Sequence, residues 1–236
     1  MVKRICWLFG CMLMLATLSR AETGSAVAAD LEGVATQMAV EILSGNYKEA
    51  IAMGAPWMQK IDTIKPGETN AIFGLLNGLS YAYVKTNRLR EAQETADVML
   101  RLLSSSDGEV KEYGYLANIY DTFVAVKDYD RAEKLIVKKL ELQKKAVGEK
   151  SREYAYTLSD LAELYAKKGD AANAEKTYLL AFALMTDESA PVEYAAAMIA
   201  ENISKLYRVT GRSDEAKSFA NKAKEIRVEY DKVNKM

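Results

Sequence analysis

Residues 154–187 read YAYTLSDLAELYAKKGDAANAEKTYLLAFALMTD, and this stretch decides the fold. Apolar or small residues of its first half have spacings that place them on one face of a helix: Leu158, Leu161, Ala162 and Tyr165. Gly169 and Asp170 then predict a stop and a restart, because glycine adopts the left-handed cap conformation and aspartate is a favoured N-cap. The second half again has one apolar face: Ala174, Tyr178, Ala181 and Leu184. The stretch is therefore predicted to be a helical hairpin.

The same hairpin recurs in register along the chain. The small residue Ala174 has regularly spaced equivalents on both sides: Ala50, Ala92, Ala132 and Ala216. The sequence therefore predicts five hairpins: about 28–64, 70–105, 110–147, 152–187 and 191–233. In the third hairpin, Asp130 followed by Glu133 predicts a capping box at the start of the second helix. One hairpin of this size cannot bury its apolar stripe, so we expect the five to stack into a continuous core.

This pattern resembles the tetratricopeptide repeat, in which leucine, small and aromatic residues mark a pair of packed helices. The 40–42-residue interval between the alanines exceeds the usual spacing of about 34 residues. It is similar to the longer repeat of kinesin light chain and related bacterial proteins, whose first helix has a leucine-asparagine-asparagine-leucine-alanine core. The equivalents here are LANIY from Leu116, LSDLA from Leu158 and AENIS from Ala200. The resemblance implies an all-α fold, an α-solenoid of about five stacked hairpins in a right-handed superhelix.

The resemblance also implies a binding function. In such arrays the first helices of successive repeats line a concave groove that holds an extended peptide or a partner protein. The groove positions of this sequence are Gly78, Asn118, Asp160 and Asn202, with Tyr81, Asp121, Tyr156, Glu163, Met198 and Lys205 beside them. Amide and carboxylate side chains at such positions can hydrogen-bond an extended backbone whatever its sequence. The alternative is that these residues only form a polar, solvated face.

The residue types present give little support to an enzyme. The chain has no histidine, and both of its cysteines, Cys6 and Cys11, lie in the segment 1–21. Histidine-based triads and metal sites are therefore excluded, as is a cysteine nucleophile in a mature chain without that segment. Asp121 and Glu163 could act as an acid–base pair, but acidic residues of a solvated groove are far commoner. We expect no enzymatic activity, no cofactor and no bound metal.

The N-terminal segment 1–21 predicts export. A basic start at Lys3-Arg4 precedes an apolar run through Leu18, and small residues follow at the cleavage position. We expect residues 1–21 to be removed and residues 22–236 to form a single tetratricopeptide-repeat domain, periplasmic or secreted, without a membrane span. A lipid anchor at Cys11 is the less favoured alternative, because only about five apolar residues precede it.

The charge balance bears on the kind of partner. The segment 1–21 contains three of the 32 basic residues and none of the 33 acidic ones, so the remaining chain has a net charge of −4. This value gives no support to nucleic-acid binding. The expected partner is therefore another protein or a peptide, whose identity the sequence leaves open.

A structural role is the second class of function that the sequence allows. The array could serve as a scaffold or as a self-assembling component of an envelope complex. Trp57, with Met53 and Met58 beside it, could form the surface for such assembly. Burial of the same residues against the second hairpin would explain them equally well. The sequence does not choose an oligomeric state.

Overall fold

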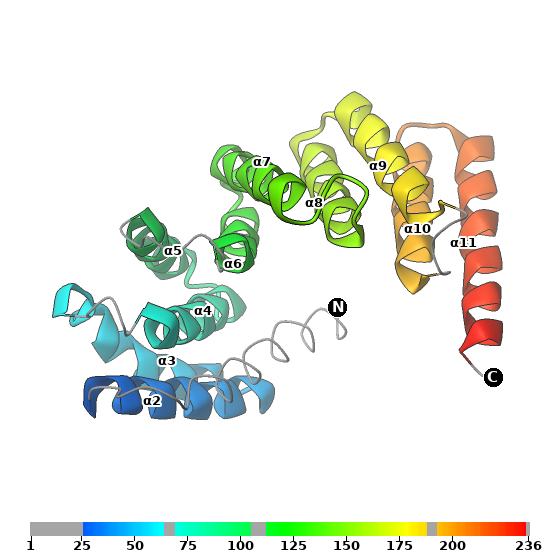
Figure 1. Ribbon diagram of the computed structural model, residues 1–236. Helices are drawn as coiled ribbons and strands as arrows, with labels where there is room; N and C mark the ends of the chain where they lie inside the picture. The colour runs from blue at the N-terminus through cyan, green and yellow to red at the C-terminus, as the bar shows by residue number, and fades with distance from the viewer. Residues whose placement is uncertain (1–25, 64–68, 105–111, 188–192, 235–236) are drawn as a thin grey trace. The chain divides into compact units, whose positions relative to one another are not determined.

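The computed structural model describes residues 26–63, 69–104, 112–187 and 193–234. Within these ranges the chain forms ten α-helices, one short 3₁₀-helix and no strand. The elements are α2 (Ala26–Leu43), α3 (Tyr47–Met58), η1 (Ile61–Thr63), α4 (Thr69–Lys85), α5 (Leu89–Ser104), α6 (Glu112–Ala125), α7 (Tyr129–Ala146), α8 (Arg152–Lys168), α9 (Ala171–Met185), α10 (Tyr194–Val209) and α11 (Ser213–Val233). They fall into two compact units, one ending at Asp128 and one beginning at Tyr129 (Figure 1). The proposed signal peptide and both cysteines lie outside the described residues, and the single-domain organisation stays a prediction.

Five equivalent turns join the helices in pairs. Each turn contains one residue with positive φ: Gly45 (81°), Asn87 (59°), Lys127 (63°), Gly169 (84°) and Gly211 (80°). The backbone N–H of the following residue returns to a carbonyl five residues earlier, as from Asp170 to Tyr165 at 2.9 Å and from Arg212 to Tyr207 at 2.8 Å. Glycine adopts this conformation at little steric cost, whereas a non-glycine residue there is uncommon. The turns therefore repeat the register that the alanines predicted.

The five regularly spaced alanines, which we call the register alanines, are buried in both units. Their exposed fractions are 5% or less: Ala50, Ala92, Ala132, Ala174 and Ala216. In the first unit, α4 contacts α2, α3, α5 and α6. Its Phe73 is fully buried, and the ring stacks on that of Tyr115 from α6 at a centroid distance of 4.2 Å. Also between α4 and α6, the buried hydroxyls of Ser80 and Thr122 form a 2.8 Å hydrogen bond. The first unit is thus packed around α4.

The second unit is a series of helices in which each contacts the next, from α7 to α11, and α8 also contacts α10. Small residues allow close approach at α10 and α11, where Ala197, Ala200 and Ala223 form a buried cluster. Phe182 of α9 and Phe219 of α11 pack on this cluster with their rings edge to face, 5.7 Å apart. None of the described helices is both long and apolar enough to cross a membrane.

Candidate functional site

Six of the predicted groove residues lie on α8 and α10, two helices of the second unit that contact each other directly. We call this set the α8–α10 face: Tyr156, Asp160, Glu163, Met198, Asn202 and Lys205. Within each helix the three residues are three or four positions apart, so they share one side of that helix. Caps at both ends fix α8, because the side chain of Ser151 accepts from the Tyr154 N–H at 3.2 Å and Gly169 ends the helix with φ 84°.

Tyr156 and Met198 are the apolar part of the α8–α10 face. Their exposed fractions are 46% and 45%, although each follows or precedes buried residues in its helix. The hydroxyl of Tyr156 donates to Glu193 at 3.0 Å, and Arg152 forms an ion pair with the same carboxylate. Burial of the phenol, followed by the charge of Glu193, raises the pKa of Tyr156 to about 12. The phenol therefore stays neutral near pH 7, with its hydroxyl held in place and part of its ring exposed.

The polar part of the face consists of half-buried or exposed groups. Asp160 and Asn202 occupy equivalent positions on the neighbouring helices, and both are half-buried. Lys205 donates a long hydrogen bond of 3.5 Å to the amide oxygen of Asn202. Glu163 pairs with Lys167 one turn away at 3.4 Å. Such solvent-accessible pairs are weak, so a ligand could exchange them for its own donors and acceptors at little cost.

The remaining predicted groove residues belong to the first unit. Tyr81 of α4 is half-buried, with Lys85 5.1 Å above its ring and Tyr47 edge-on at 6.2 Å. On α6, Asn118 is half-buried and Asp121 is exposed. Gly78 departs from the expectation of an open groove position. It is buried beneath α2, where an added Cβ would lie 3.3 Å from Ile42 Cδ1.

The residues predicted as an assembly surface in the first hairpin pack inward to differing degrees. Trp57 is only 9% exposed, and Lys60 lies 4.6 Å above its ring. Met53 and Met58 are half-buried. Packing within the first unit therefore accounts for Trp57, and this part of the chain gives the scaffold hypothesis no exposed aromatic surface.

Two ion-pair clusters that the sequence did not predict connect successive hairpins of the second unit. Lys168 of α8 donates to Asp130 at 2.8 Å and to Glu133 at 2.7 Å, both on α7. Glu175 of α9 accepts from Tyr207 at 2.9 Å and from Arg212 at 2.6 Å. Glu133 and Glu175 each come directly after a register alanine, which is the signal that could have revealed them.

The capping box predicted at Asp130 is wrong. Helix α7 begins at Tyr129, so Asp130 lies inside its first turn rather than at its N-cap. Its carboxylate accepts instead from Lys168, which belongs to the next hairpin of the chain. The donor to Asp130 is thus the ammonium group of Lys168, where a capping box would have a backbone N–H of α7 as the donor.

The side chains of the α8–α10 face can be compared with what a metal site and a peptide-binding site each require. Among the described residues, no three histidine, cysteine, aspartate or glutamate side chains gather as a metal site would require. The α8–α10 face offers an anchored phenol, a thioether, a carboxamide and carboxylates on a fixed helical frame. Groups of this kind can hydrogen-bond a peptide backbone and contact apolar side chains.

The helical pairs, their common turn and their 40–42-residue register define a tetratricopeptide-like repeat fold of the kinesin light chain type. BtubC (BKLC) from P. vanneervenii is similar over 87% of this chain and 82% of its own, with 20% identity and a TM-score of 0.69. A variant of a kinesin light chain protein from Podosopora anserina with nearly identical TPR-like repeats has a TM-score of 0.74, at 13% identity over 89% of this chain and 100% of its own. MamA is similar over 83% of this chain and 96% of its own, with 15% identity and a TM-score of 0.56.

No protein-family model and no curated protein sequence matches the chain. At the identities above, the structural likeness shows the fold alone.

Proposed function

We propose that the chain is an exported, non-enzymatic binding module that holds an extended segment of a partner protein on the α8–α10 face. The observation that carries this proposal is the exposure of Tyr156 and Met198, close to one half each, at equivalent positions on two contacting helices. Apolar groups held on a rigid frame beside hydrogen-bonding groups favour recognition, because little side-chain entropy is lost on binding.

The polar residues of the face supply the rest of the mechanism. In this proposal, Asp160 and Asn202 hydrogen-bond the backbone of an extended segment, and Tyr156 and Met198 contact its apolar side chains. Asp160 and Glu163 favour a basic residue in that segment. In the first unit, Asn118 and Asp121 are equivalent to Asp160 and Glu163, and the proposal assigns them the same roles there, with Tyr81 as an apolar contact.

The test first locates the site and then measures it. A photo-crosslinking amino acid replaces Met198 in the full chain, and the control carries it at Leu180, which is 50% exposed on α9. The partner segment that crosslinks from position 198 is then synthesised as a labelled peptide. Crosslinking from position 180 with equal yield would show that the α8–α10 face is not selective.

Affinity for that peptide gives the quantitative result. Each neutral hydrogen bond contributes about 0.5–1.5 kcal/mol. The variant Asn202→Ala should therefore weaken binding by roughly twofold to tenfold in Kd, with helicity and Tm unchanged. Unchanged affinity in this variant would contradict the proposed site.

Export is tested separately by the mass of the protein isolated from its source cells. The expected mature chain begins at Glu22 and carries no lipid. An acylated Cys11 would replace this with the lipid-anchored alternative, and a retained Met1 in the cytoplasm would contradict export altogether.

A further inference from the structure

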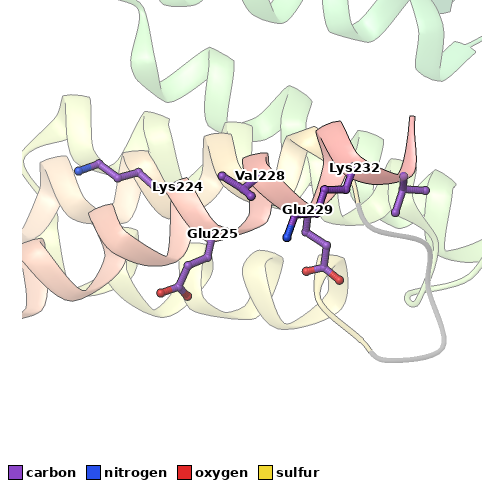
Figure 2. A pocket seen from close by; sticks show the side chains of 6 residues that line it. Lys224, Glu225, Val228, Glu229 and Lys232 are labelled. Carbon is purple, nitrogen blue, oxygen red and sulfur yellow. The ribbon is translucent and has the colours of Figure 1, made fainter. Parts of the chain in front are cut away.

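The outer face of α11 is a helix surface without a covering element among the described residues. Helix α11 packs on α10 through one side, which includes Ala216, Phe219, Ala223, Ile226 and Tyr230. The opposite side forms a shallow hollow lined by Lys224, Glu225, Val228, Glu229, Lys232 and Val233 (Figure 2). Val228 and Val233 are 55% and 54% exposed. We call this side the outer face of α11.

This face differs from the equivalent face of the preceding hairpin. Phe182 of α9 packs on the next hairpin, with its ring 5.7 Å from that of Phe219. The equivalent position one repeat later holds Lys224, which is exposed. A charged, exposed residue thus stands where the preceding hairpin has a partly buried aromatic, so the face is not built to receive another hairpin of the same array. Helix α11 also continues as far as Val233, well beyond Arg227, the equivalent of Met185 at the end of α9.

The charges of the outer face form a pattern that is complementary to itself. Positions i and i+7 lie on the same edge of a helix, because they are separated by about two turns. One edge therefore carries Lys224 and Asp231, and the other carries Glu225 and Lys232, with Val228 between them. None of these four charged side chains forms an ion pair within the part of the chain that the structure describes. Of these four residues, each edge holds one positive and one negative, and Glu229 lies farther around the helix from Val228 on the side of Glu225.

We propose that the outer face of α11 binds a second copy of itself, with the two helices antiparallel and crossing at Val228. In a two-fold antiparallel pair each edge meets the same edge of the other copy in reverse order. Glu225 then faces Lys232 of the second copy on one edge, and Lys224 faces Asp231 of the second copy on the other. The two Val228 side chains pack in the middle and exclude water from the contact.

The antiparallel orientation is favoured over the parallel one. Parallel helices would place Asp214 opposite Asp214 of the second copy, because Asp214 lies about four turns before Val228 on the same line of the helix. Like charges directly opposite each other are repulsive. Parallel macrodipoles also repel, whereas antiparallel ones attract. The antiparallel pair crossing at Val228 leaves Asp214 outside the contact.

The size of the contact determines its strength. About three helical turns per copy are involved, which is small beside the roughly 800 Å² per partner of a standard interface. The pair is therefore a weak dimer whose population rises with protein concentration. This association is independent of the peptide-binding function proposed above and is measured without any other partner.

Sedimentation analysis of the chain from Glu22 onward tests the proposal over a range of concentrations. The expected result is a monomer–dimer equilibrium whose Kd rises roughly tenfold or more in either single variant, Glu225→Lys or Lys232→Glu. Each variant creates two repulsive contacts at once because of the two-fold symmetry. The matched control is Glu141→Lys, the same charge change at an exposed site on α7.

Two recombinations of these variants make the test specific. The double variant Glu225→Lys/Lys232→Glu restores both opposite-charge contacts in the antiparallel pair and should recover dimerisation. A mixture of the two single variants should form a heterodimer that neither forms alone. A strictly monomeric parent chain, a dimer indifferent to Glu225→Lys, or a double variant as weak as the singles would each overturn the proposal.

Discussion

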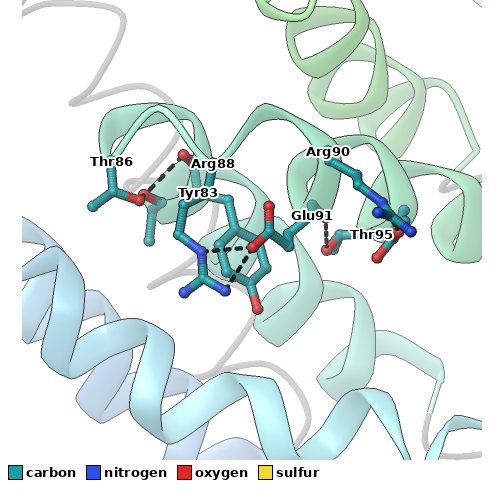
Figure 3. Close-up of polar contacts among 8 residues, drawn as sticks. Tyr83, Thr86, Arg88, Arg90, Glu91 and Thr95 are labelled. Carbon is teal, nitrogen blue, oxygen red and sulfur yellow. Dashed lines mark hydrogen bonds and ion pairs between the residues drawn. The ribbon is translucent and has the colours of Figure 1, made fainter.

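Two turns share one local arrangement, the turn between α4 and α5 and the turn between α10 and α11. They differ in which type of residue the preceding hairpin places beside them. At the first turn, Arg88 lies 4.7 Å above the ring of Tyr83 and donates to Glu91 at 2.8 Å (Figure 3). These contacts join residues three and five positions apart. They are therefore encoded within one hairpin.

The second turn repeats this arrangement and adds a partner. Arg212 lies 4.2 Å above the ring of Tyr207 and donates to Glu215 at 2.8 Å. Glu175 of the preceding hairpin also accepts from both Tyr207 and Arg212. The position equivalent to Glu175 in the first hairpin holds Ile51, which is 7% exposed. The same local motif is thus combined with an apolar residue in the first unit and with a carboxylate in the second.

This difference shows how the two units hold successive hairpins together. The second unit uses the pairs Glu133–Lys168 and Glu175–Arg212. Between α5 and α6 the first unit has Phe123 where the second unit has a tyrosine, so no phenol is available to bond. It uses a buried hydroxyl pair, Ser80 and Thr122, and aromatic stacking instead. The contacts that join successive hairpins therefore differ between the two units, while the register of the helices is the same in both.

The largest expected effect on stability comes from disrupting a feature that both units share, the close approach of neighbouring helices at the register alanines. Ala174→Leu places a larger side chain at a fully buried position next to Glu175. Overpacking of this kind should lower the free energy of unfolding by about 1–3 kcal/mol. Denaturant unfolding provides the measurement, and the exposed Ala172→Leu is the control. Equal shifts for the two variants would contradict the register.

A second variant sharpens the comparison by giving α7 an apolar residue, which both units have at the equivalent positions of other helices. Gln143 of α7 is 3% exposed, and its amide oxygen has no hydrogen-bond partner among the described residues. The equivalent positions hold Leu103 in the first unit and Met185 in α9. Because an unsatisfied buried polar group is unfavourable, Gln143→Met should raise the free energy of unfolding by about 1–2 kcal/mol. A loss of stability in urea unfolding would mean that the amide makes a needed contact.

A matched pair of tyrosine variants tests the contact between the hairpin α8–α9 and the hairpin α10–α11. Tyr207→Phe removes the hydrogen bond to Glu175, which should lower the free energy of unfolding by about 0.5–1.5 kcal/mol. Tyr83→Phe is the control, because no described residue accepts from its hydroxyl. We expect the control to change stability much less. The same loss in both variants, measured by thermal unfolding, would assign the effect to the ring environment rather than to the hydrogen bond with Glu175.

The sequence predicted those parts of the fold that depend on one hairpin at a time. Gly169 ends α8 with positive φ, and Asp170 caps α9 by accepting from the Asn173 N–H at 3.1 Å, as its residue types indicated. Burial of the register alanines followed from the 40–42-residue interval, because a small residue in every copy implies a close helix contact. These features are local or periodic, so one sequence is enough to find them.

Contacts between hairpins were harder to predict. Asp130 looked like a cap because its own helix offers backbone N–H groups, whereas its actual donor is Lys168. The register also indicated that Tyr156 and Met198 are exposed, and they are. It could not indicate that Glu193 would hold the Tyr156 hydroxyl, since that contact depends on how the chain enters α10. That a partner binds there stays a prediction.

The smallest expected effect on stability at neutral pH comes from the hydroxyl of Tyr156. Tyrosine ionises at about 10 in an unfolded chain, and in the folded protein the pKa of Tyr156 is raised to about 12. The unfolded state therefore loses its proton first as pH rises, so the stability linked to this group is complete below pH 10 and is lost toward pH 12. Other partly buried tyrosines such as Tyr115 also have raised pKa values, so the parent protein alone cannot isolate the effect. The informative quantity is the difference in free energy of unfolding between the parent chain and Tyr156→Phe, which should be small and constant up to pH 10 and should then shift in favour of the variant. Parallel pH profiles for the two proteins would mean that Glu193 and burial do not hold the phenol in its neutral form.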